Sequence, residues 1–201
     1  MDSVLILNGS PRAPRSNSKR YAQLFLEACP LETVYFDLIK TEQAKVLKAM
    51  EETSRVLLVF PLYVDGLPVV LLEFLKYLEE HPPENRPTLS VLINCGFLEL
   101  EQNNIAVEMI RLFARKNGYP MGAVLKIGGG EAILDTPFRG FARAKIRTLA
   151  RAVAKDQKRV MGVTMPLPKK LFLKASSRYW EAYGRKNGVT REQMETMEIE
   201  G

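Results

Sequence analysis

Short apolar runs alternate with stretches of helical periodicity along most of the chain, and this alternation restricts the fold more than any other feature of the sequence. The runs consist mainly of Val, Ile, Leu and Phe, a pattern typical of strands buried on both faces of a parallel sheet. Turn residues, and then apolar residues at helical spacing, follow each run. The expected strands are residues 4–7, 32–38, 55–60, 88–94 and 122–127, and the expected helices cover about 16–28, 41–52, 69–80, 102–117 and 141–157.

Five strands separated by helices predict an α/β fold with a doubly wound parallel sheet and helices on both faces. The 201 residues are enough for one domain with a sizeable core. We expect this domain to cover residues 1–160, and residues 161–201 to form a C-terminal extension of the same globular unit. Ligands of such sheets bind beyond the carboxyl ends of the strands. This rule selects three loops as the candidate site: residues 10–18, 61–68 and 94–99.

The loop after the first strand carries groups that bind phosphate. Residues 8–11 (Asn-Gly-Ser-Pro) form a turn, and Ser16, Asn17 or Ser18 can cap the helix that follows. Free backbone N–H groups at a helix start, together with the positive end of the helix dipole, favour an anion there. The alternative is a capped helix beside a basic surface loop. The candidate phosphate ligands are the side chains of Ser10, Arg12, Arg15, Ser16, Asn17 and Ser18.

Two nucleotide-binding motifs are missing from this loop. It lacks the Gly-Lys-Ser/Thr ending of a P-loop and also lacks the Gly-x-Gly-x-x-Gly fingerprint. A triphosphate or a Rossmann-bound dinucleotide is therefore disfavoured. The other two loops offer Tyr63, Phe97 and backbone amides around glycines, which suit a flat heteroaromatic ring. Cys95 lies beside them and is either redox-active or, as we expect, a buried inert side chain.

Composition places the chain among ordinary globular proteins, with 46% hydrophobic and 26% charged residues. The first residues resemble no signal peptide, and no apolar run is long enough to span a membrane. Two distant cysteines, Cys29 and Cys95, predict neither a disulfide framework nor a metal site, so we expect a cytoplasmic protein without metal or integral membrane contact.

The net charge of +6 is unevenly distributed. Between Arg139 and Arg191 only Asp156 and Glu181 are acidic. Such a region is a solvated helix face or a surface for nucleic acid, an anionic membrane or a small anion. No nucleic-acid-binding module motif accompanies the charge, and we expect no nucleic-acid partner.

A basic amphipathic helix is expected near the C-terminus, over residues 169–186. Pro166 and Pro168 precede it, and its apolar positions include aromatic residues. We expect this helix to pack on its own domain or on a second subunit, and a membrane-surface role is the third interpretation. The large apolar residues named for this helix are Leu173, Tyr179, Trp180 and Tyr183.

Three motifs together resemble one known family. They are Asn-Gly-Ser-Pro-Arg with Ser-Asn-Ser in residues 8–18, Pro-Leu-Tyr-Val-Asp-Gly-Leu-Pro in residues 61–68, and a glycine-bearing turn after the fourth strand. This combination is similar to the flavodoxin-like NAD(P)H-dependent FMN reductases and related NAD(P)H oxidoreductases. The resemblance implies strand order 2-1-3-4-5, a non-covalent FMN, NAD(P)H as donor and a homodimer. The implied acceptor is a quinone, an azo or nitro compound, a metal complex or a protein.

The resemblance also assigns cofactor roles and no catalytic side chain. The alternatives are a flavodoxin-like electron carrier and a cofactor-less binding or regulatory module on the same fold. Two features depart from the family pattern: residues 13–15 lengthen the first loop, and the triple glycine at 128–130 has no nicotinamide-binding partner motif. The resemblance implies that Ser10, Arg12, Ser16, Asn17 and Ser18 hold the phosphate, that Pro61, Leu62, Tyr63, Val64 and Gly66 line the ring, and that Asn94, Cys95, Gly96 and Phe97 approach its other edge.

Overall fold

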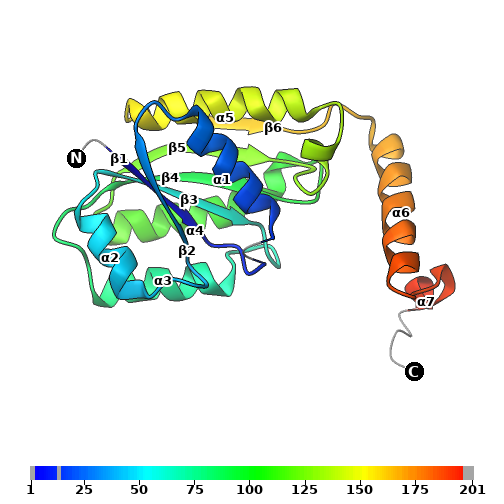
Figure 1. Ribbon diagram of the computed structural model, residues 1–201, viewed down its shortest axis with the longest axis horizontal. Coiled ribbons are helices and arrows are strands. Elements are labelled where there is room, and N and C mark those ends of the chain that lie inside the picture. The colour runs from blue at the N-terminus through cyan, green and yellow to red at the C-terminus, as the bar shows by residue number, and fades with distance from the viewer. Residues whose placement is uncertain (1–2, 13–14, 197–201) are drawn as a thin grey trace. The chain divides into compact units, whose positions relative to one another are not determined.

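The computed structural model describes residues 3–12 and 15–196, so part of the lengthened first loop, residues 13–14, lies outside the described residues. A parallel sheet of six strands in the order β2-β1-β3-β4-β5-β6 forms its centre (Figure 1). The α/β class and the expected order of the first five strands agree with this sheet. The strands are β1 (Ser3–Asn8), β2 (Glu32–Asp37), β3 (Arg55–Pro61), β4 (Thr88–Asn94), β5 (Met121–Ile127) and β6 (Val160–Val163).

The expectation of five strands was wrong, because the apolar run that begins at Val160 adds a sixth. Strand β6 pairs in parallel with β5 along four residues, from Val124↔Val160 to Ile127↔Val163. It lies at the sheet edge, where Val160 is exposed. A four-residue run at an edge carries little periodicity of its own, so its pairing with β5 defines it as a strand.

Helices cover both faces of the sheet (Figure 1). Helices α1 and α5 lie together on one face, and α2, α3 and α4 cover the other. A single 3₁₀ turn precedes α4, and another precedes α5. The helices are α1 (Asn17–Ala28), α2 (Gln43–Glu51), α3 (Val69–Glu80), α4 (Asn104–Lys116) and α5 (Arg139–Ala154), and the 3₁₀ turns are η1 (Leu100–Asn103) and η2 (Ile133–Asp135).

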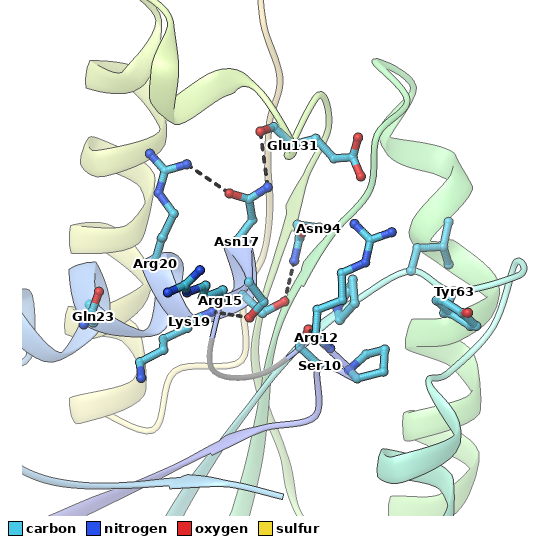
Figure 2. A pocket seen from close by; sticks show the side chains of 15 residues that line it. Ser10, Arg12, Arg15, Asn17, Lys19, Arg20, Gln23, Tyr63, Asn94 and Glu131 are labelled. Atoms are coloured by element: carbon cyan, nitrogen blue, oxygen red, sulfur yellow. Dashed lines mark hydrogen bonds between the residues drawn. The ribbon is translucent and has the colours of Figure 1, made fainter. Parts of the chain in front are cut away.

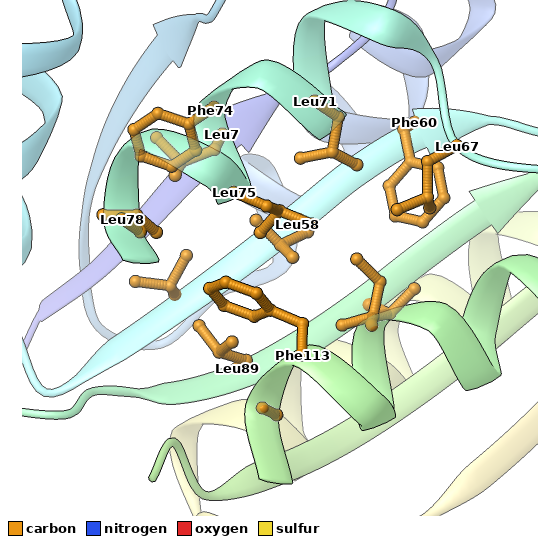
Figure 3. Packing of buried hydrophobic residues seen from close by; sticks show 14 of the residues in the cluster. Leu7, Leu58, Phe60, Leu67, Leu71, Phe74, Leu75, Leu78, Leu89 and Phe113 are labelled. Atoms are coloured by element: carbon orange, nitrogen blue, oxygen red, sulfur yellow. The ribbon is translucent and has the colours of Figure 1, made fainter. Parts of the chain in front are cut away.

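A continuous apolar core fills the space between the sheet and α2, α3 and α4 (Figure 3). Strand residues such as Leu7, Leu58 and Phe60 meet Phe74 of α3 and Phe113 of α4 there. Each of these five side chains is at most 7% exposed. Burial of this apolar surface is the main source of stability, and it fixes the strand ends from which the site loops emerge.

The chain divides into two compact units, residues 1–165 and residues 166–201. The second unit contains α6 (Lys169–Lys186), with the bounds expected from the sequence, and α7 (Arg191–Thr196). Inclusion of the extension in one globular unit with the sheet stays a prediction. No helix within the described residues combines the length and the apolar character needed to cross a membrane.

Candidate functional site

A hollow of about 580 Å³ lies at the carboxyl ends of β1, β3 and β4 (Figure 2). The loop after β1, the first two turns of α1 and the residue after the β5–α5 glycines complete its wall. Ten of the residues proposed from sequence line this hollow, so the structure brings the two halves of the expected site together. The lining residues are Ser10, Pro11, Arg12, Arg15, Ser16, Asn17, Ser18, Lys19, Arg20, Gln23, Pro61, Leu62, Tyr63, Asn94 and Glu131.

The start of α1 supplies donors to one end of the hollow. Ser16 is the N-cap, with its Oγ accepting a hydrogen bond from the Lys19 backbone N–H at 3.1 Å. The N–H groups of Asn17 and Ser18 belong to the first helical turn and have no acceptor within the helix. Ser18 is buried, and its Oγ accepts from Nδ2 of Asn94 at 3.1 Å, which holds α1 against β4. This geometry suits an oxyanion.

Asn8, at the end of β1, fixes the backbone of the loop that follows this strand. It is fully buried, and its Oδ1 accepts a hydrogen bond from the Ser10 backbone N–H at 3.1 Å. Its Nδ2 donates to the Tyr35 hydroxyl at 3.0 Å and to Oδ1 of Asp37 at 2.9 Å. The two acceptors fix which way the amide points. Asn8 thereby connects a carboxylate on β2 to the backbone of the candidate phosphate loop.

The Tyr35 hydroxyl also donates to Asp37. Burial, followed by this hydrogen bond, raises the pKa of Tyr35 above its ordinary value, so the phenol stays protonated as a donor. The three side chains of Asn8, Tyr35 and Asp37 are called the Asn8 network below. Its members on β2 were not singled out by sequence, because only the register Asn8↔Asp37 brings them to the loop.

Cationic side chains surround the donor end of the hollow. Arg12, Arg15 and Lys19 line it, and Figure 2 shows the Arg12 side chain extending between Asn94 and Tyr63 toward Glu131. Arg20 is already paired, through two hydrogen bonds of 2.8 and 2.6 Å, with Asp135. The hydrogen bonds from Arg20 lower the pKa of Asp135, although Arg20 is only half-buried and Asp135 is largely exposed. The electrostatic field of these cationic side chains favours binding of an anion in the hollow.

The triple glycine at 128–130 lets the β5–α5 loop pass close to β4. A Cβ on Gly130 would lie 2.8 Å from Cβ of Asn94, and one on Gly128 would lie 2.6 Å from the Leu98 carbonyl oxygen. The loop is also tied to α1, because the Tyr21 hydroxyl donates to the Gly130 carbonyl oxygen at 2.6 Å. The glycines therefore have a packing role beside the hollow.

Replacing Gly130 with alanine is expected to lower the free energy of unfolding by about 1–3 kcal/mol, because the added methyl group overlaps Asn94. Chemical denaturation measures this change. Gly140→Ala is the control, since a Cβ there meets nothing within 4 Å and Gly140 lies in α5. That variant is expected to be neutral or more stable by up to about 1 kcal/mol. Equal stability of both variants would contradict the packing role of Gly130.

The residues after β3 form the opposite, less polar wall. Leu62 N–H donates to the Asn94 carbonyl oxygen at 2.7 Å, and Tyr63 and Gly66 exchange backbone hydrogen bonds of 3.2 and 3.0 Å. Val64 and Asp65 between them have φ of 47° and 56°, which is strained for a β-branched valine. The turn leaves Tyr63 50% and Val64 89% exposed. An aromatic ring at the mouth of the hollow suits a planar ligand.

Five proposed residues do not line the hollow itself: Val64, Gly66, Cys95, Gly96 and Phe97. Gly96 lies near it, since a Cβ there would be 3.9 Å from the Glu131 carboxyl group. Cys95 is buried, and its Sγ accepts from Nδ2 of Asn103 at 3.2 Å. Burial raises the pKa of this thiol, and the expected buried position is confirmed, whereas its inertness stays a prediction.

Four further residues line the hollow that the sequence motifs did not predict: Pro11, Lys19, Arg20 and Gln23. The last three follow Ser16 at steps of three or four along α1, so they share its face of the helix. Helical spacing counted from the N-cap was the signal that could have found them.

Comparison with known proteins gives structural neighbours only. No protein-family model matches the chain, and no curated protein does. A flavodoxin of Streptococcus pneumonia TIGR4 superposes with a TM-score of 0.56 at 12% identity, covering 76% of this chain and 98% of that one. An FMN-dependent NADH-azoreductase from Bacillus anthracis in complex with FMN gives 0.59 at 12% identity, covering 77% and 100%.

A third neighbour is larger than this chain. Rubredoxin oxygen:oxidoreductase from Desulfovibrio gigas gives a TM-score of 0.61 at 13% identity, and the match covers 77% of this chain but 36% of that one. At these identities the likeness concerns the fold. The fold is flavodoxin-like, with β6 as an added edge strand.

Proposed function

We propose that this chain is an FMN-dependent NAD(P)H oxidoreductase, in which FMN accepts hydride from NAD(P)H and passes electrons to an acceptor. The observation that carries the proposal is the polarity of the hollow. One end combines the N-terminus of α1 with serine hydroxyls and Arg15, the other end is walled by residues 61–63, and the Arg12 side chain extends between them. An FMN molecule has the same division, with a phosphate at one end and a flat ring at the other.

The described residues fit FMN by charge and by position. Ser10, Ser16, Asn17, Ser18 and Arg12 would hold the phosphate, as N–H, hydroxyl and guanidinium donors do in charge-assisted hydrogen bonds. The volume of about 580 Å³ lies within the usual range for cofactor sites. Pro61, Leu62 and Tyr63 would line the ring together with Val64 and Gly66 of the adjoining turn, and Asn94 would approach its other edge together with Cys95, Gly96 and Phe97 of the loop beside the hollow.

Bound FMN supplies the redox chemistry, exchanging a hydride with NAD(P)H and electrons with the acceptor. The protein chain would bind FMN, orient its ring and shield part of it from water. The Asn8 network holds the Ser10 backbone in place, and the hydrogen bond from Asn94 to Ser18 links the phosphate end to β4. Tyr63 is half exposed at the mouth, so a second planar molecule can reach that face. No side chain of the site is assigned an acid–base role.

The acceptor class and the assembly belong to the same proposal. A quinone, an azo or nitro compound, a metal complex or a protein would accept the electrons, and the azoreductase among the structural neighbours supports such chemistry. We place the enzyme in the cytoplasm. A homodimer is supported by large apolar side chains exposed on α3 and α4, namely Val69, Ile105 and Leu112.

An absorption spectrum of the purified protein tests the cofactor directly. We expect flavin bands, present on purification or retained after incubation with FMN and desalting. Adding NADPH without oxygen should bleach them, because hydride reaches the bound flavin. Absence of retained flavin would overturn the proposal and favour a cofactor-less binding module.

Turnover separates an enzyme from an electron carrier, the alternative favoured by the flavodoxin among the structural neighbours. Steady-state oxidation of NADPH or NADH with a quinone or ferricyanide should be fast relative to the reaction without protein. A flavin that binds but is reduced by neither nucleotide would identify the carrier.

A further inference from the structure

Helix α6 divides into an aromatic face and a basic face. Most of the large apolar side chains lie along one side at helical spacing, and most of the Lys and Arg side chains lie along the opposite side. The exceptions are Lys169 and Leu171 in the first turn and Lys186 in the last. The aromatic face consists of Phe172, Leu173, Tyr179, Trp180 and Tyr183, and the basic face of Lys170, Lys174, Arg178 and Arg185.

Neighbours within its own unit leave most of the aromatic face exposed. Helix α7 meets α6 near Gly184, where Sδ of Met194 lies 2.7 Å from the position a Cβ would take. Leu173, Tyr179, Trp180 and Tyr183 are each 43–56% exposed. The rings of the last three contact one another, with centroids 5.3–6.3 Å apart. The result is a cluster of exposed aromatic rings, a feature typical of an interaction surface.

The charge of α6 indicates the chemistry of that partner. The helix has six Lys and Arg residues and one acidic residue, Glu181. Glu181 forms an ion pair with Arg191 of α7, with an N···O distance of 3.6 Å. Its negative charge is therefore balanced by Arg191 and does not neutralise the basic face of α6. The whole chain carries +6, so the overall charge of a second copy does not favour its association with this basic helix. An anionic surface is the complementary partner.

We propose that α6 binds the surface of an anionic lipid bilayer, lying in the interface with its aromatic face toward the acyl chains. Tyrosine and tryptophan favour this boundary because their rings are apolar and their polar atoms reach water. Lys and Arg on the other face attract anionic headgroups. A helix of 18 residues with so many charges lies on a bilayer and does not span it.

Trp180 gives a direct test, since it is the single tryptophan of the chain. The full-length protein is mixed with vesicles of equal parts phosphatidylcholine and phosphatidylglycerol, or with phosphatidylcholine alone. We expect co-sedimentation and a blue shift of Trp180 emission with the anionic vesicles, because the indole leaves water. Neutral vesicles and high salt should both reduce binding strongly. No binding to anionic vesicles would overturn the proposal.

Paired variants separate the two faces of α6. The double variant Lys174→Gln/Arg178→Gln should bind anionic vesicles about 30-fold more weakly, since each cation contributes to surface binding. The control Lys40→Gln/Lys155→Gln removes two exposed charges of the first unit and should bind like the unaltered protein. Equal weakening of both variants would show adsorption by overall charge and contradict a site on α6.

Leu173→Gln tests the aromatic face without changing charge. It should reduce both sedimentation and the blue shift, because an amide replaces apolar surface at the acyl boundary. Binding equal to that of the unaltered protein would contradict insertion of this face. Trp180 emission already blue-shifted without lipid, and unchanged when anionic vesicles are added, would show that protein covers the face and would overturn the proposal. None of these measurements depends on a bound flavin.

Discussion

Replacing Asn8 with alanine is expected to weaken FMN binding about tenfold or more while leaving riboflavin binding nearly unchanged. Riboflavin has the same ring and lacks the phosphate. Asn8 accepts a hydrogen bond from the Ser10 N–H, so its loss frees the phosphate loop and leaves the ring wall at residues 61–63 intact. Pre-organised donors bind more tightly than mobile ones, because ordering them on binding costs free energy.

Flavin fluorescence titration of the apoprotein measures both dissociation constants, and their ratio is the informative quantity. Asn8→Ala should also lower the free energy of unfolding by about 2–3 kcal/mol, because Tyr35 and Asp37 no longer accept hydrogen bonds from Nδ2 of Asn8. Thr53→Val is the matched control. It removes a buried hydrogen bond to Ser3 at the opposite end of β1, so stability should fall without a change in the ratio.

A second variant keeps the test usable if Asn8→Ala does not fold. Asp37→Asn retains the shape of the side chain and an acceptor for Asn8, but removes the negative charge. The ratio of FMN affinity to riboflavin affinity should fall in this variant too, by a smaller factor than in Asn8→Ala. Equal weakening of FMN and riboflavin by the Asn8 network variants would mean that the network supports the sheet and not the phosphate loop.

Local signals were enough to predict the main elements that form the hollow. The β1 run, the turn chemistry at residues 8–11 and the Ser16 cap depend on residues close in sequence, and the structure has the strand, loop and helix in that order. The apolar run of β3 likewise ends where Pro61 begins the second loop. Because the carboxyl ends of parallel strands lie at the same edge of a sheet, the proximity of these two loops could be predicted from the sequence.

Features that depend on pairing between distant segments could not be predicted from local sequence signals. Strand β6 exists through its hydrogen bonds to β5, and four residues are too few for a periodic pattern. The Asn8 network joins residues 27 and 29 positions apart, and a shift of one residue in the β1–β2 register would point Asp37 to the other face. The close approach that requires Gly130 involves Asn94 on another strand.

The core beneath the site gives the largest expected effect on stability. Phe74→Ala should lower the free energy of unfolding by about 3–5 kcal/mol, because the aromatic ring is buried and its removal leaves a cavity. Phe74 lies on α3 in the cluster that includes Leu7 of β1 and Leu58 of β3. Strand β1 leads into the loop proposed to hold the phosphate, and β3 leads into residues 61–63, proposed to line the ring, so the cavity would lie beneath both segments.

Chemical denaturation of the apoprotein measures the loss, with Leu26→Ala as control. Leu26 is a large apolar residue of α1 that is 43% exposed, so its truncation should cost no more than about 1 kcal/mol. The ratio of FMN to riboflavin affinity should stay unchanged in folded Phe74→Ala, since the donors at the start of α1 are not touched. Stability and selectivity for the phosphate would then be separable, the first residing in the core and the second in the Asn8 network. A loss below 1 kcal/mol would contradict the tight packing of Phe74, and a changed ratio would show that the core positions the phosphate loop directly.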